Sequence, residues 1–194
     1  MGEEIDWDSL TISLTPTDTM YITNAEMGEP WMPGELIPYG DMKISPAAGV
    51  LNYGQGLFEG MTAYRTSKDR VVFFRPDDNA RRMQRGADRL KMPPVPESIF
   101  VDAVEQCVKA NLRWLPPMGK GAMYVRQLLM GSGPILGGAP APSDRVLVYV
   151  TPVGPYFKGG VKAIDLLISD VHHRAAPGGS GGVKASGNYA PGMM

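Results

Sequence analysis

The sequence has little of several features that would assign it to common classes of protein. It contains one cysteine, Cys107, in 194 residues, which excludes an internal disulfide and suits a reducing compartment. No apolar run approaches the length of a membrane-spanning helix. The acidic start, residues 3–8, is unlike a secretory signal or an Arg-rich transit peptide. We therefore expect a cytoplasmic protein, or a plastid or mitochondrial one if a targeting segment was removed.

Charge and composition narrow the choice further. The net charge is −1, from 19 basic and 20 acidic residues, so nothing general indicates a nucleic acid or an anionic membrane as partner. The content of apolar residues, 43%, and of charged residues, 20%, is that of a globular protein. The 24 glycines and 18 prolines indicate short elements interrupted by turns.

Periodicity predicts an α+β domain with an antiparallel sheet and two helices over residues 1–153. The expected elements are extended pieces near residues 20–23, a hairpin with strands at 61–65 and 70–74, helices over 77–90 and 97–115, and strands at 122–130 and 145–151. Cys107 falls in the apolar stripe of the second helix, which predicts a small buried hydrophobic residue rather than a nucleophile.

A second domain is expected to begin after this one. Turn residues predict a linker over residues 154–163, and an apolar run predicts a strand at residues 163–169. Residues 164–194 would then hold only the first strand and a loop of that domain, which cannot bury a core of their own. Exposed Leu166 and Leu167 would make the isolated chain poorly soluble.

Two features carry candidate chemistry. Arg82, Arg85 and Arg89 share one helix face, which is usually a solvated basic face, but an inward-turned guanidinium could bind a phosphate through two hydrogen bonds. Near the C-terminus, the glycine-rich residues 178–182 are closely followed by Lys184. Such an amine can form a Schiff base with an aldehyde. Taken alone, the loop is more typical of a solvated Gly/Ser coil.

Three motifs favour the Schiff-base interpretation of Lys184 over a solvated coil. They are residues 174–191, residues 51–60 with Phe58-Glu59-Gly60, and Phe74-Arg75-Pro76. In order and spacing they resemble the branched-chain amino acid aminotransferases, pyridoxal-phosphate enzymes of fold type IV, and the plant members are the most similar. The resemblance runs from about Trp7 onward. It implies reversible amino transfer between leucine, isoleucine or valine and 2-oxoglutarate, with the cofactor pyridoxal 5'-phosphate, no metal, and a homodimer in the full-length family.

The resemblance also implies roles for single residues on the cofactor side. Lys184 matches the lysine that forms the Schiff base and moves the substrate proton. Arg82 matches the arginine that binds the cofactor phosphate. Tyr189 matches the tyrosine beside the ring oxygen, and Arg174 is assigned to the same side.

On the substrate side, the resemblance implies an aromatic pocket. Tyr53 and Phe58 match residues that shape the apolar side-chain pocket, and Tyr124 and Arg126, alternate residues on one strand, match the pair near the substrate carboxylate. Tyr156 matches the aromatic residue of the interdomain loop. Without the resemblance, each ring would be interpreted as core packing.

The family continues well past its lysine, whereas this chain ends ten residues after Lys184. The family's further segment supplies a glutamate at the pyridine nitrogen and donors to the phosphate. We therefore expect a truncated chain in which transamination is impaired. The alternatives are a non-catalytic relative that acts as a binding or dimerisation module, or another fold type IV enzyme, such as a D-amino acid aminotransferase or an aminodeoxychorismate lyase. The stretch from Gly181 to Lys184, with Gly187-Asn188-Tyr189, favours the branched-chain group.

Overall fold

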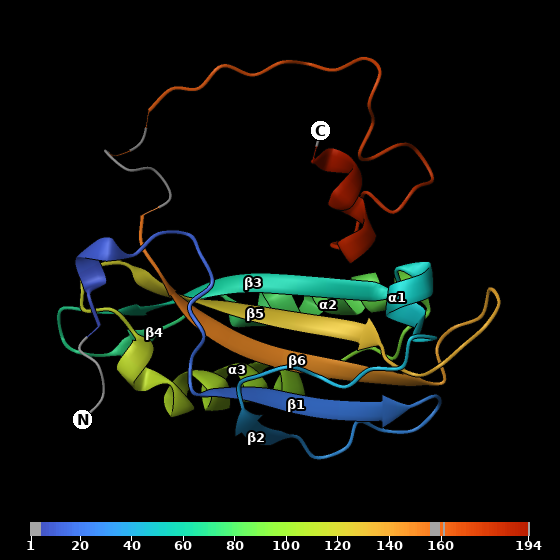
Figure 1. The fold of residues 1–194 in the computed structure, drawn as a ribbon, viewed down its shortest axis with the longest axis horizontal. Coiled ribbons are helices and arrows are strands. Elements are labelled where there is room, and N and C mark those ends of the chain that lie inside the picture. The colour runs from blue at the N-terminus through green and yellow to red at the C-terminus, as the bar shows by residue number, and fades with distance from the viewer. Residues whose placement is uncertain (1–4, 156–159, 161, 194) are drawn as a thin grey trace.

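The computed structural model describes residues 5–155, 160 and 162–193. Its centre is a six-stranded antiparallel sheet in the order β2-β1-β6-β5-β3-β4 (Figure 1). The elements are β1 (Thr19–Glu26), β2 (Glu35–Pro38), α1 (Gly49–Tyr53), β3 (Gly56–Arg65), β4 (Val71–Val72), α2 (Pro76–Leu90), α3 (Glu97–Ala110), β5 (Ala122–Gly131) and β6 (Ser143–Val153), with 3-10 helices at Trp7–Ser9, Leu112–Trp114, Ser186–Asn188 (η3) and Ala190–Gly192 (η4).

Helices α2 and α3 cover one face of this sheet (Figure 1). Successive side chains of a strand point to opposite faces, so the alternate residues of β3, β5 and β6 that face the helices form the main core. Phe100 of α3 and Leu57 and Met123 of the sheet are among its fully buried side chains. The C-terminal segment returns to the edge of β3, where Leu57 and Ala185 form a bridge. The expected α+β domain with an antiparallel sheet is confirmed.

The α2 helix matches the helix predicted over residues 77–90. Pro76 occupies its first turn, where a missing N–H costs nothing, and Asp77 and Asp78 complement the positive end of the helix dipole. Its buried face includes Gly86, where an added Cβ would lie 2.8 Å from a methyl carbon of Leu57. The absence of a side chain there lets α2 lie close against β3.

The predicted hairpin and the two later strands are confirmed as β3–β4, β5 and β6. The second helix ends at Ala110, earlier than the predicted residue 115. The reason is Asn111, whose buried side chain accepts hydrogen bonds from the backbone N–H groups of Asp18 and Thr19 and so ties the helix end to β1. In the described part of the chain, no helix is long and apolar enough to cross a membrane.

The strand predicted over residues 163–169 is wrong for the described part of this segment. Residues 162–169 form neither helix nor strand, and the side chains of Leu166 and Leu167 are 83% and 96% exposed. A β-strand is stabilised by hydrogen bonds to a neighbouring strand and by packing of one face. No described segment lies beside this one to supply either. The expected exposure of the two leucines is confirmed.

Cys107 behaves as the sequence indicates. Its side chain lies in the core beneath α3, and burial raises the pKa of its thiol to about 12. The thiol therefore stays protonated at physiological pH and is not a nucleophile.

Asp144, at the start of β6, is a buried carboxyl group that affects stability. It is 2% exposed, and its Oδ1 atom has no hydrogen-bond partner among the described residues. Burial raises its pKa from 3.8 to about 7. The folded protein therefore binds this proton more tightly than the unfolded chain, so the free energy of unfolding falls as pH rises from about 4 to 7 and stays lowered above that.

We expect Asp144→Asn to stabilise the protein at pH 8 by about 1–3 kcal/mol, because the amide carries no charge to desolvate. At pH 4, where Asp144 is protonated in the folded protein, the variant should match the wild type. Urea unfolding of both proteins at the two pH values measures this difference. An equal effect of the substitution at pH 4 and pH 8 would show that Asp144 does not titrate in this range.

Candidate active site

The C-terminal segment returns to the sheet and places Lys184 beside β3. The backbone N–H of Phe58 donates to the carbonyl oxygen of Lys184 at 3.2 Å, and Leu57 and Ala185 form an antiparallel bridge. In Figure 1 the red segment with η3 and η4 lies above β3. Lys184 is therefore held against the sheet by backbone hydrogen bonding and does not lie on a free coil.

The loop before Lys184 is closed by a buried asparagine. The Ser180 hydroxyl donates to Asn188 Oδ1 at 2.6 Å, and Asn188 Nδ2 donates to the carbonyl oxygens of Ser180 and Val183 at 2.8 and 2.9 Å. Asn188 is 6% exposed. These hydrogen bonds fix the chain immediately before the lysine. Sequence reasoning named Asn188 only within a motif and missed this role.

The Lys184 amine lies among aromatic groups. Its Nζ donates to the hydroxyl of Tyr189 at 2.8 Å, and it lies 4.4 Å from the ring centroid of Phe58 and 5.2 Å from that of Tyr189. The two rings contact each other, with centroids 4.7 Å apart. A cation over ring faces is attracted by their negative quadrupole. The structure thus brings together three of the candidate residues, Lys184, Tyr189 and Phe58.

Arg126 joins this group through the same ring. Its guanidinium carbon lies 4.4 Å from the centroid of Phe58 and 5.3 Å from that of Tyr124. Its Nε atom is buried and has no hydrogen-bond partner among the described residues. A buried donor without a partner is costly unless an acceptor reaches it. The Arg126 side chain also lines the cavity described below, where its guanidinium can pair with a carboxylate.

Tyr124 lies across the neighbouring strand β3 because Gly60, diagonally across from it, has no side chain. A Cβ added at Gly60 would lie 2.0 Å from the Tyr124 hydroxyl oxygen. Gly60 is paired with Arg126 in the β3–β5 register, so the ring and the guanidinium share one face of the sheet. Tyr124 and Arg126 therefore lie together, as alternate residues of one strand do.

A cavity of about 950 Å³ extends along this face from Tyr124 and Arg126. Its lining is mostly apolar and includes Tyr64 and Tyr149, which sequence reasoning missed. The signal that could have found them is strand alternation, since both fall on the same face as Tyr124 and Arg126. The remaining lining residues are Ile12, Ser13, Leu14, Thr62, Gly119, Gly121, Ala122, Thr151, Val153, Gly154 and Pro155.

Arg82 lies on α2 and is paired with a glutamate that the sequence reasoning did not single out. Glu59 accepts from Arg82 Nε at 2.5 Å and from Nη2 at 2.6 Å, and its side chain is fully buried. The hydrogen bond with Glu59 raises the pKa of Arg82, and electrostatic interaction with Tyr189 acts in the same direction.

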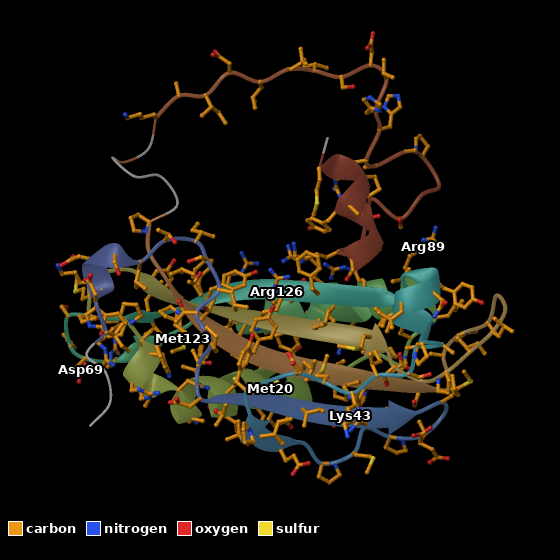
Figure 2. The ribbon with its side chains drawn as sticks, viewed as in Figure 1. Met20, Lys43, Asp69, Arg89, Met123 and Arg126 are labelled. Atoms are coloured by element: carbon orange, nitrogen blue, oxygen red, sulfur yellow. The ribbon has the colours of Figure 1, made fainter. Side chains whose placement is uncertain are left out.

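The other arginines of the α2 row differ in their contacts. Arg85 lines a cavity of about 300 Å³ together with Arg75, Arg82, Asp78 and Asn79. Arg89, labelled in Figure 2, donates from Nη2 to the carbonyl oxygen of Gly178 at 3.1 Å and so contacts the glycine loop. The row is thus divided among a buried carboxylate, a cavity and the loop. All three side chains are nevertheless exposed, as expected for a solvated basic face.

The remaining candidates are placed less centrally. The Arg174 guanidinium carbon lies 6.0 Å from the ring centroid of Tyr189, at the margin of the group. Tyr53 is half exposed at the end of α1, and its hydroxyl accepts from the Gly137 N–H at 2.7 Å, so it contacts the β5–β6 loop. Tyr156 lies outside the described residues. Among the described residues, no group of three or more His, Cys, Asp or Glu side chains could hold a metal ion.

Comparison with known proteins gives sequence similarity over nearly the whole chain. No protein-family model matches it. It is 55% identical over 187 residues to branched-chain amino acid aminotransferase 2, chloroplastic, of Humulus lupulus, covering 96% of this chain and 46% of that protein. It is 45% identical to the methionine aminotransferase BCAT4 of Arabidopsis thaliana, covering 96% and 52%. The chain spans about half the length of the curated relatives it matches.

Solved structures agree on the fold. A branched-chain aminotransferase of the archaeon Thermoproteus uzoniensis with norvaline matches with a TM-score of 0.68 and 25% identity, over 92% of this chain and 54% of that one. The branched-chain amino acid aminotransferase from Escherichia coli matches with a TM-score of 0.68 and 24% identity, over 89% of this chain and 51% of that one. The sheet and helices described above are therefore those of fold type IV aminotransferases.

Proposed function

Because this chain is homologous to plant branched-chain amino acid aminotransferases along 96% of its length, we propose that it carries the small domain and the reactive lysine of a pyridoxal-phosphate-dependent aminotransferase. One observation supports this above the others. The Lys184 amine, hydrogen-bonded to Tyr189 and lying over Phe58, is held beside the strand whose next residue binds Arg82. We propose that this amine and this guanidinium bind the aldehyde and the anionic end of one small molecule.

The residues present fit that cofactor. Pyridoxal phosphate supplies an aldehyde for the amine and a ring that withdraws electrons from the substrate. Lys184 Nζ would hold the aldehyde end and carry a proton to and from the substrate. The Tyr189 hydroxyl would donate a hydrogen bond to an oxygen beside that end. Arg82, with Nη1 not engaged by Glu59, would bind the phosphate.

The substrate class follows from the open face of the sheet. Arg126, which lines the cavity on this face, would pair through its guanidinium with the carboxylate of an amino acid, and the rings of Phe58 and Tyr124 would contact an apolar side chain. We propose branched-chain amino acids and their 2-oxo acids, with 2-oxoglutarate as amino acceptor. Methionine is the second candidate, because a relative is named for it and its side chain is also apolar.

The remaining parts of the proposal concern organisation. Residues 1–153 would be the small domain, residues 154–163 the linker and residues 164–194 the start of a large cofactor domain, in a protein that forms homodimers. The cytoplasmic location stays a prediction. The relatives named chloroplastic or mitochondrial favour an organelle instead. Imaging of a fluorescent fusion expressed from the complete transcript distinguishes these compartments.

Titration of the purified chain with pyridoxal phosphate tests the central proposal. We expect a new near-ultraviolet or visible band on binding, and a change in that band when L-leucine is added. D-Leucine is the control for the substrate, because it carries the same groups with the opposite handedness at the α-carbon. A band that is absent, or that forms equally on the unfolded chain, would contradict the proposal and favour a non-catalytic binding module.

A further inference from the structure

The proposed function leaves one buried charged group unexplained. Glu59 has a fully buried side chain in the middle of β3, between Leu57 and Met61, which face the same helical core. A carboxylate in an apolar stripe is expensive to bury unless it is paired and hydrogen-bonded. Its presence there calls for a reason beyond packing.

Both oxygens of this carboxylate accept hydrogen bonds, and the donors lie in α2 and in the same strand. Oε1 accepts from Arg82 Nε, and Oε2 accepts from Arg82 Nη2, from Asn79 Nδ2 at 2.9 Å and from the Gly60 N–H at 3.3 Å. Asn79 also donates to the Gly60 carbonyl oxygen at 3.3 Å. The carboxylate is thus fixed from two sides before any ligand arrives.

A fixed carboxylate in turn fixes the guanidinium. The paired contacts use the Nε–Nη2 edge of Arg82, so the plane of the fork is set and the Nη1 donors are left for another acceptor. The Arg82 side chain is 48% exposed and lines the 300 Å³ cavity with Arg75 and Arg85. Asp78, which pairs with Arg75, also lines this cavity, so Arg82 and Arg85 supply the net positive charge that an anion requires.

We propose that Glu59 is a positioning residue for the cofactor phosphate: it holds Arg82 so that the free Nη1 edge meets the phosphate. This inference rests on the proposed function. Phe58 and Glu59 are consecutive in β3 and point to opposite faces of the sheet. One dipeptide therefore places both ends of the site, with Phe58 under the Lys184 amine and Glu59 under Arg82.

The test compares pyridoxal phosphate with pyridoxal, which lacks the phosphate, using fluorescence quenching of the full 194-residue chain. We expect Glu59→Gln to bind pyridoxal phosphate about 10- to 100-fold more weakly, while its affinity for pyridoxal stays within about twofold of wild type. A purely structural role of Glu59 would weaken both ligands together or neither. Glu97→Gln is the matched control, since Glu97 pairs with the neighbouring Arg81 on α2 at the surface.

A second variant keeps the test decisive if Glu59→Gln does not fold. Arg82→Lys leaves a cation for Glu59 but removes the planar fork. We expect the same selective loss for pyridoxal phosphate, and wild-type affinity in this variant would overturn the proposal. Failure of the proposed function itself looks different, because the wild-type chain would then show no preference for pyridoxal phosphate over pyridoxal.

Discussion

Lys184→Ala is expected to abolish site-specific covalent capture of pyridoxal phosphate. The amine is the nucleophile of the proposed site, and no other described lysine amine lies over an aromatic ring and against a tyrosine hydroxyl. An alanine has no group that can condense with an aldehyde. The expected effect is therefore complete loss at this position, larger than that of any other single substitution considered for the site.

Reduction with borohydride followed by peptide mapping measures the capture directly. The wild-type chain should carry the adduct mainly on the peptide that contains Lys184, and Lys184→Arg should remove it although the charge is kept. Lys68→Ala is the control, because Lys68 lies in the exposed turn between β3 and β4. Labelling spread evenly over the surface lysines of the wild type would refute a specific site.

Arg82→Ala is expected to lower the free energy of unfolding by about 2–4 kcal/mol, because it leaves the Glu59 charge buried without its partner. The expected loss is smaller than for a fully buried pair, since Arg82 is itself half exposed. Adding Glu59→Gln to this variant should recover most of the loss, because the remaining buried group is then neutral. Urea unfolding of the single and double variants measures both effects.

The matched control for this prediction is Arg81→Ala on the same helix. Arg81 pairs with Asp77, Asp78 and Glu97 at the surface, where solvent weakens each pair, so its loss should cost about 1 kcal/mol or less. If Arg82→Ala cost no more than Arg81→Ala, Glu59 would not depend on its partner for burial. Because Arg82→Ala also destabilises the fold, loss of cofactor binding in this variant alone would not show that Arg82 contacts the phosphate.

Much of the fold follows from local pattern. The spacing of Ala80, Met83 and Ala87 predicts α2, and the alternation along residues 122–130 predicts β5. The order of the strands does not follow, because it depends on contacts between distant parts of the chain, such as β1 beside β6. For residues 163–169, the local pattern predicted a strand that does not form. Their apolar pattern suits a strand, but the strand also needs a neighbour to pair with.

The reacting groups of the site could be predicted from the sequence, but the residues that position them could not be predicted as fully. The resemblance named Lys184, Arg82, Phe58 and Tyr189, and the structure places Phe58 and Tyr189 around the Lys184 amine. The resemblance did not say what orients Arg82. Strand alternation alone could have pointed to Glu59, because Leu57 and Met61 share its face and both are core residues. An acidic residue in such a stripe requires a partner, and the adjacent helix offers a row of arginines.

The opposite orientations of Phe58 and Glu59 limit how β3 can change its length. Inserting or deleting one residue of β3 before Phe58 would turn every following side chain of the strand to the other face. The ring beneath the amine and the carboxylate beneath the guanidinium would be lost in a single step, with the ring directed at the helices and the charge directed at the open face. Length variation in this part of a homologous protein is therefore tolerable in the turn after Arg65, and not within the strand itself.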